Sequence, residues 1–226
     1  MFNTLKLDSD ILDTFKMEIS GIFLKQLHAL RTYEAYQQIN KLIDYKNILL
    51  KYDEIESKLL TRKEIDKVVR VVFSQSDFSF TYSVSDYVPI EKTVSLQLKA
   101  YPKQLSGLGP QNYKWVKRQF WDELIKEKSA DAFDVISVNE KNELVETSRF
   151  NIFLFDKKKD IVFTPALTSG CINGVYRRFV FYQNYIQLPE LGKKQIQEIC
   201  LTAEKIYDYQ LFVANSVREV LLAELL

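Results

Sequence analysis

The second half of the chain is a series of short apolar runs joined by polar turns, and this pattern limits the fold more than any other feature. Runs 133–138 and 143–145 flank one polar turn, and runs 151–155 and 161–163 flank the charged turn Asp156–Asp160. Runs of this length with short turns between them are typical of β-hairpins, whose strands pair antiparallel. Repeating parallel βαβ units would need a helix after each strand. The sequence therefore predicts an antiparallel or mixed sheet here.

The first part of the chain combines helical and extended patterns. Met1–Leu7 alternates like a strand, and the stretch from Gly21 to about Leu60 carries apolar residues at helical spacing. Two β-branched and aromatic runs, 68–73 and 78–83, follow with a short polar turn between them. Together with the hairpins of the second half, these patterns predict an α+β fold.

A segment rich in proline and glycine separates the two parts. Residues 101–110 hold two prolines and two glycines, and they follow a strand-like run at Val94–Lys99. Such a composition is typical of a linker. We therefore predict two subdomains with mixed or antiparallel sheets, a small α/β subdomain at 1–100 and a larger one at 111–226.

Charge and histidine content exclude several kinds of function. The 31 basic and 30 acidic residues cancel, so no electrostatic surface for nucleic acid or a membrane is expected. His28 is the only histidine, which argues against zinc sites built on histidine pairs, and no metal site is expected. It lies in a helix-like stretch, and we interpret it as a surface or boundary residue. An enzyme with this sequence must use lysine, carboxylate or tyrosine as its acid and base.

The chain ends and the cysteines indicate a compartment. Met1–Asp10 places Asp8 and Asp10 where a secretory signal needs an apolar run, and no run approaches the ~20 apolar residues of a membrane span. Cys171 and Cys200 are isolated thiols, which fits a reducing compartment. We expect a cytoplasmic protein in which Cys171 is a packed, inert thiol.

The most informative stretch for function is Glu146–Phe153, which reads ETSRFNIF and is followed by Thr164-Pro165 and by GCINGVYR at Gly170–Arg177. We expect the acidic residue to open a short apolar strand, and the glycine-bracketed loop to enter a helix at Val175–Gln187. The first amides of a helix lack acceptors within it and attract anions. This layout suits a ligand with a planar cationic ring at one end and a phosphate at the other.

In order and spacing, these residues resemble the signature of the class IV pyridoxal-phosphate enzymes, the family of the branched-chain and D-amino-acid aminotransferases and of aminodeoxychorismate lyase. The resemblance is dense over residues 110–222 and weaker over 1–100, where Phe2–Leu7 and Arg70 are the main points of similarity. It implies the class IV aminotransferase-like fold, pyridoxal 5'-phosphate as the cofactor, a small-molecule substrate and a homodimer.

The resemblance also implies that Lys114 is the catalytic lysine that bonds to the cofactor's aldehyde. Lys114 follows the linker, is expected to head a helix at Trp115–Lys126, and precedes Glu146 by 32 residues. A free lysine with a pKa of ~10.4 is almost fully protonated at pH 7. Burial or neighbouring cations must therefore lower its pKa, and Lys117 and Arg118 are placed to contribute. Lys117 is the alternative lysine.

The remaining cofactor contacts follow from the same resemblance. Glu146 is expected to face the ring nitrogen. Arg70, the backbone amides of Val175 and Tyr176, and Ser216 are expected to bind the phosphate. Many family members carry threonine where Tyr176 stands, so only its backbone amide is expected to contribute.

The resemblance favours one reaction of the family. Branched-chain enzymes usually carry tyrosine four residues after the lysine, whereas this chain has Arg118 and the loop Gly170–Gly174, which look more like aminodeoxychorismate lyase. A guanidinium binds the carboxylates of that substrate bidentately. The implied reaction is that of a 4-amino-4-deoxychorismate lyase, which releases pyruvate to leave 4-aminobenzoate, a folate precursor. Two alternatives stay open: a class IV aminotransferase for branched-chain or D-amino acids, and a non-catalytic binding relative.

Overall fold

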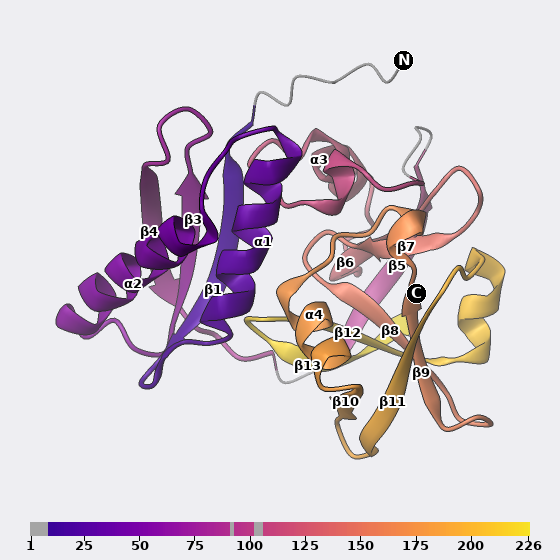
Figure 1. The fold of residues 1–226 in the computed structure, drawn as a ribbon. Helices are drawn as coiled ribbons and strands as arrows, with labels where there is room; N and C mark the ends of the chain where they lie inside the picture. The colour runs from indigo at the N-terminus through magenta and orange to yellow at the C-terminus, as the bar shows by residue number, and fades with distance from the viewer. Residues whose placement is uncertain (1–8, 91–92, 102–105) are drawn as a thin grey trace. The chain divides into compact units, whose positions relative to one another are not determined.

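A computed structural model describes residues 9–90, 93–101 and 106–226. The expected strand Met1–Leu7 and residues 102–105 of the expected linker lie outside the described residues. By its contacts the chain divides into two compact units: Met1–Tyr87 with Tyr113–Arg118, and Val88–Asn112 with Gln119–Leu226. We call them the first and the second unit, and Figure 1 shows the elements of both.

The first unit is an antiparallel sheet with two helices packed on one face (Figure 1). Its strands, in the order β2-β1-β3-β4, and its helices are β1 Ile11–Glu18, β2 Gly21–Ile22, β3 Lys67–Phe73, β4 Phe80–Asp86, α1 Lys25–Gln38 and α2 Tyr45–Thr61. Alternate residues of β1, including Phe15 and Met17, meet Tyr36 of α1 and Tyr52 of α2 in the core. The period of two in the strand and the helical period above it thus share one apolar layer.

The helical pattern expected from Gly21 to about Leu60 is confirmed as two helices with a break. Asn40 takes a left-handed backbone with φ of 57°, and the Asp44 carboxylate caps α2 by accepting the Lys46 amide at 3.0 Å. The hairpin expected at 68–83 is confirmed as the β3-β4 pair.

The second unit is built on a nine-stranded mixed sheet in the order β10-β11-β9-β8-β12-β13-β5-β6-β7. Its strands are β5 Val94–Ala100, β6 Asp134–Val138, β7 Leu144–Thr147, β8 Asn151–Asp156, β9 Ile161–Pro165, β10 Tyr185–Leu188, β11 Gly192–Ile199, β12 Gln210–Asn215 and β13 Glu219–Leu225. The helices are α3 Gln119–Lys126 and α4 Val175–Tyr182, with 3-10 turns at Pro110–Asn112, Leu167–Ser169 and Ala203–Asp208. The β6-β7 and β8-β9 hairpins confirm the antiparallel pairs expected from the sequence, and the α+β class is confirmed.

Parallel pairing also occurs, and it changes the position of one strand. β5 was expected in the small subdomain because it precedes the proline- and glycine-rich segment. In the structure it pairs parallel with both β13 and β6, inside the large sheet. The domain boundaries at 1–100 and 111–226 stay a prediction.

Two helix expectations were wrong at one end. The helix expected at Trp115–Lys126 begins at Gln119, because the Val116 amide donates to Asp10 O at 2.9 Å and Trp115 bridges to Ile11. The helix expected at Val175–Gln187 ends at Tyr182, since Asn184 has a φ of 61° and the chain then enters β10. Backbone pairing stops the helical pattern in the first case, and a left-handed residue stops it in the second.

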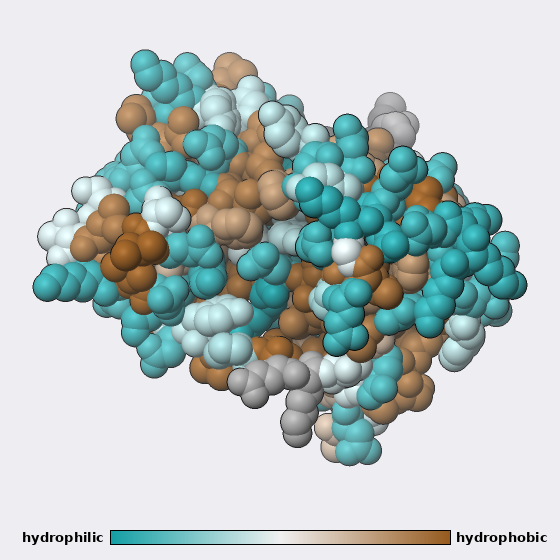
Figure 2. Space-filling model, turned by 90° about the horizontal axis from the view of Figure 1, so that it is seen from below, coloured by the Kyte–Doolittle hydropathy of each residue, from teal (hydrophilic) through white to brown (hydrophobic). Residues whose placement is uncertain are grey.

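On the face of the molecule seen in Figure 2, hydrophobic residues are interspersed among hydrophilic ones. None of the helices within the described ranges is both long and apolar enough to span a membrane.

Candidate active site

Lys114 lies in an extended segment beside the start of β1. Its carbonyl accepts the Leu12 amide at 2.9 Å, and its half-buried side chain donates from Nζ to Thr14 Oγ1 at 3.1 Å. The expectation that Lys114 heads a helix was therefore wrong. Pairing along the backbone fixes this lysine against the first-unit sheet.

The surroundings of Lys114 favour its neutral form. Burial, the guanidinium of Arg31 and, to a smaller extent, Arg118 and Arg70 lower the pKa of Lys114 to about 7, and the Asp13 carboxylate partly opposes them. A cation near an ammonium group disfavours its charged form. Arg118 thus contributes as the sequence predicts, whereas Lys117 is exposed and uses its backbone amide to bond Ser9 Oγ at 2.8 Å.

A buried polar cluster lies behind this lysine. The Asp13 carboxylate accepts hydrogen bonds from His28 Nδ1 at 2.9 Å, from Arg31 Nη2 and from the Tyr52 hydroxyl. Burial opposes ionisation of Asp13, but His28 and Arg31 outweigh it and hold its pKa well below its usual value. Thr32 Oγ1 completes the cluster at 2.7 Å from the Tyr52 hydroxyl.

His28 was expected at the surface or the boundary, and that interpretation was wrong. Its side chain is fully buried, and burial lowers its pKa despite the adjacent Asp13. The ionised Asp13 carboxylate accepts from Nδ1 and so favours a proton on that nitrogen. Within the described residues, Nε2 has no hydrogen-bond partner.

Sequence reasoning missed Arg31, Thr14 and Asp13 as neighbours of Lys114. One signal was present: Asp13 falls in phase with Ile11, Phe15 and Met17, all of which are buried. An acid on the apolar face of a strand requires a cationic partner. A search for that partner on the following helix leads to His28 and Arg31.

Arg70 lies in β3 with its side chain exposed, opposite Thr14 in the strand register. Directly opposed residues of antiparallel strands share one face of the sheet. Thr14 and Arg70 therefore lie on the face of the sheet opposite to Asp13 and its partner Arg31, and the charges of Arg31, Arg118 and Arg70 all act on Lys114.

Glu146 lies in the second unit. It was expected to open a strand, and that expectation was wrong: Glu146 is buried inside β7, and the next strand begins at Asn151. Asn151 Nδ2 donates to Glu146 Oε2 at 2.9 Å and to the Ile172 carbonyl at 2.9 Å. Asn151 belongs to the motif Glu146–Phe153, but its contact with Glu146 depends on the turn between β7 and β8 and was not predicted.

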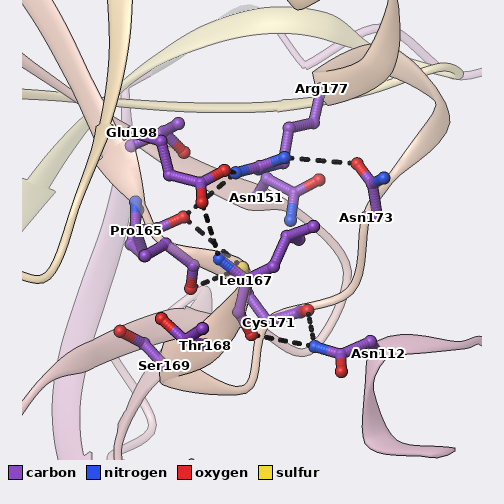
Figure 3. Close-up of polar contacts among 12 residues, drawn as sticks. Asn112, Asn151, Pro165, Leu167, Thr168, Ser169, Cys171, Asn173, Arg177 and Glu198 are labelled. Carbon is purple, nitrogen blue, oxygen red and sulfur yellow. Dashed lines mark hydrogen bonds and ion pairs between the residues drawn. The ribbon is translucent and has the colours of Figure 1, made fainter. Parts of the chain in front are cut away.

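The loop between β9 and α4 is held on two sides, as Figure 3 shows. Asn112 Nδ2 donates to the carbonyls of Leu167 and Cys171 at 3.0 and 2.7 Å. On the other side, Arg177 pairs with Glu198 and donates to Asn173 Oδ1 at 3.2 Å. These contacts fix the backbone that leads into α4.

α4 begins at Val175 with Gly174 as its N-cap, and its first amides are those expected to bind phosphate. Burial, with a contribution from Glu219, raises the pKa of Tyr176 to about 12. α4 packs against β12, the strand that leads into the turn holding the buried Ser216. The binding of one phosphate by Val175, Tyr176 and Ser216 stays a prediction.

Each unit supplies groups that suit pyridoxal phosphate. The first unit holds an amine with a near-neutral pKa among guanidinium groups. The second holds a buried carboxylate joined through Asn151 to a helix N-terminus, the chemistry needed for a ring nitrogen and a phosphate. The convergence of Lys114 with Glu146 on one ligand stays a prediction.

Comparison with known proteins identifies related folds. The family model described as Amino-transferase class IV matches residues 11–224. No curated protein matches the chain. The structure of a Mesorhizobium loti protein, provisionally named an amino-acid aminotransferase, has a TM-score of 0.81 and 21% identity, covering 97% of this chain and all (100%) of that one.

Two further solved structures share the fold at lower identity. 4-Amino-4-deoxychorismate lyase from Pseudomonas aeruginosa has a TM-score of 0.72 and 14% identity, covering 96% of this chain and 83% of its own. The PLP-bound form of a hypothetical aminotransferase from Mycobacterium tuberculosis has a TM-score of 0.76 and 12% identity, and the match covers 96% of this chain and 81% of that one.

Proposed function

Because this chain belongs to the class IV aminotransferase family, whose members are pyridoxal-phosphate-dependent enzymes, we propose that Lys114 bonds covalently to the cofactor and that Glu146 faces its ring nitrogen. The observation that carries this assignment is the pKa of Lys114, lowered to about 7 by burial and by Arg31. The pKa values of Lys16, Lys25 and Lys67 are instead raised. A nucleophilic lysine needs the first environment rather than the second.

The same environment supports acid–base chemistry at Lys114. When bound, pyridoxal phosphate withdraws electrons from the substrate carbon next to the amino nitrogen. Once the substrate amine has replaced it on the cofactor, Lys114 Nζ would take the proton from that carbon and deliver it to a different atom, since a group whose pKa lies near the working pH is an efficient acid and base. Thr14 Oγ1 orients Nζ by accepting its hydrogen bond. The Glu146 carboxylate holds a proton on the ring nitrogen through a charge-assisted contact.

In this proposal the phosphate is bound by the backbone amides of Val175 and Tyr176, by Ser216 and by an arginine. Arg70 is the arginine expected from the sequence, but its side chain is exposed. Arg31 has the larger effect on Lys114, is buried, and is held in place by Asp13. We therefore add Arg31 to the groups that attract the anionic cofactor.

For the reaction, we propose a 4-amino-4-deoxychorismate lyase, which releases pyruvate and leaves 4-aminobenzoate, a folate precursor. Arg70 and Arg118 act on Lys114 in addition to Arg31, whose charge is paired with Asp13. Such a concentration of positive charge supports a substrate with several carboxylates in addition to the anionic cofactor. Arg118 binds one of those carboxylates in this proposal.

Transamination is the second candidate. It is supported by the provisional name of the M. loti protein, whose whole chain is matched. In that case Lys114 would move the proton between the substrate carbon and the cofactor, and a second amino acid, such as glutamate, would supply the amino group. For either reaction we propose a cytoplasmic homodimer, and sedimentation of the purified protein tests the dimer.

Two measurements test the proposal. Borohydride reduction of the protein with pyridoxal phosphate, followed by peptide mass spectrometry, is expected to leave the cofactor on Lys114, and Lys117→Ala is expected to leave that result unchanged. A Lys114→Ala protein that still traps the cofactor at a specific lysine contradicts the assignment.

Pyruvate release from aminodeoxychorismate without an added oxo acid supports the lyase. Glutamate-dependent amination of a branched oxo acid without pyruvate release supports the aminotransferase.

A further inference from the structure

Asn151 connects the two cofactor-binding parts of the second unit. Its side-chain nitrogen donates to Glu146 Oε2 and to the Ile172 carbonyl, both at 2.9 Å. An amide NH2 group carries two hydrogens, so these two contacts use its full donor capacity. The side chain is buried, and Figure 3 shows it among the residues of the loop before α4.

Gly174 provides the space that Asn151 occupies. A methyl group on Gly174 would lie 2.1 Å from Asn151 Oδ1, far inside contact distance. The backbone of Gly174, with φ of −62° and ψ of 154°, is one that any residue adopts. Glycine is therefore needed here for room and not for conformation.

The Ile172 carbonyl joins these features into one unit. It accepts from Asn151 Nδ2 at 2.9 Å and from the Gly174 amide at 2.8 Å. Gly174 is also the N-cap of α4. A single side chain thus holds both the Glu146 carboxylate and the turn from which the α4 amides emerge.

We propose that Asn151 is a positioning residue that sets the spacing between the Glu146 carboxylate and the N-terminus of α4. This inference rests on the proposed function, in which these groups bind the ring nitrogen and the phosphate. The ring nitrogen and the phosphate belong to one ligand with a fixed separation. An error in the spacing of the protein groups that bind them therefore weakens one contact or the other. A neutral amide suits the task, because its hydrogen bond favours the charged carboxylate without supplying a competing cation.

The test is a double-mutant cycle of Asn151→Ala and Gly174→Ala, read by the dissociation constant of pyridoxal phosphate. Each single variant is expected to bind the cofactor about tenfold more weakly, since each releases Glu146 from its position. In the Asn151→Ala background, Gly174→Ala is expected to add little, because the atom it clashes with is gone. An equally large loss from Gly174→Ala in both backgrounds overturns the role of Asn151 as the residue that fills this space.

A second measurement separates positioning from general stability. Pyridoxamine phosphate cannot bond to lysine, so the pH dependence of its absorption when bound reports its ring nitrogen. Displacing Glu146 is expected to lower the pKa of that nitrogen by about one unit in Asn151→Ala. Thermal unfolding without cofactor checks that the wild type and Asn151→Ala are both folded. If they are, an unchanged pKa of the ring nitrogen overturns the inference.

The matched control is Asn142→Gly. Asn142 also donates its amide to a carboxylate, that of Glu204, but at the exposed turn between β6 and β7. Glycine keeps the left-handed backbone of this position, whose φ is 61°. Wild-type cofactor binding is expected. A wild-type protein that binds no pyridoxal phosphate contradicts the proposed function itself. Normal binding by Asn151→Ala, Gly174→Ala and the double variant contradicts only the role of Asn151.

Discussion

Lys114 and Asp13 interact through Thr14. Lys114 Nζ donates to Thr14 Oγ1 at 3.1 Å, and the Thr14 amide donates to Asp13 Oδ1 at 2.8 Å. The Asp13 carboxylate raises the pKa of Lys114, whereas Arg31, which pairs with that carboxylate, lowers it more strongly. Arg31 therefore offsets the anion that would otherwise keep Lys114 protonated.

Arg31→Gln is expected to raise the pKa of Lys114, because it removes a cation and leaves Asp13 less compensated. In the cofactor-free protein, the pH midpoint for acetylation of Lys114 is expected to move upward from about 7. Peptide mass spectrometry after brief labelling measures it. Arg62→Gln, at an exposed arginine bonded to Tyr82, serves as the control. The same midpoint in Arg31→Gln as in the wild type contradicts this account.

Lys114→Met is expected to stabilise the cofactor-free protein below pH 7. The folded-state pKa of about 7 lies below the ~10.4 of an unfolded lysine, so the folded state binds fewer protons between these values. The wild type therefore gains stability as pH rises through this window, and Lys114→Met does not. The difference at pH 6 is expected to be roughly 1–2 kcal/mol, given the partial exposure of the side chain. Urea unfolding at pH 6 and pH 9.5 checks it, and parallel pH dependences refute it.

At the scale of elements, the loop from Leu167 to Gly174 is held by side chains that are not its own. Asn112 bonds two of its carbonyls from the 3-10 turn at Pro110–Asn112, and Arg177 holds Asn173 from α4. Cys171 lies within this loop with its side chain buried, and burial raises the pKa of its thiol. The expectation of a packed thiol at this position is confirmed.

Asn112→Ala is expected to loosen this loop and expose Cys171. In the wild type, a thiol reagent is expected to modify the exposed Cys200 quickly and the buried Cys171 slowly. Loss of the two Asn112 hydrogen bonds, each contributing about 1 kcal/mol, is expected to speed Cys171 labelling at least about tenfold. Mass spectrometry of both cysteine peptides measures the rates, with Cys200 as the internal control. An unchanged ratio of the two rates shows that Asn112 does not hold the loop.

At the scale of the whole molecule, cofactor binding is expected to raise thermal stability. A ligand at one hundred times its dissociation constant stabilises the folded state by about 2.7 kcal/mol, which for a chain of this size is a rise in Tm of roughly 5–10 °C. Pyridoxal without phosphate is the matched control. It is expected to give a smaller rise in Tm, because it has no phosphate for the α4 amides and Ser216 to bind. Equal shifts from the two ligands contradict the phosphate assignment. Scanning calorimetry provides the measurement.

Much of the molecule follows from neighbours along the chain. The hairpins β3-β4, β6-β7 and β8-β9 were predicted because each consists of two apolar runs and a short turn. The loop into α4 was predicted for a similar reason, since its glycines and the helix start lie within a few residues. Strand β1 was not predicted, although its buried residues alternate.

The sequence by itself determined the hairpins, the helix N-terminus and the residue types that suit the cofactor, because these depend on local spacing and composition. The tertiary structure decided which cations surround Lys114, that His28 is buried, and that Asn151 bonds Glu146. The pKa of a side chain and the partner of a buried donor depend on groups brought close by folding. Such groups come from distant parts of the chain, so no local pattern specifies them.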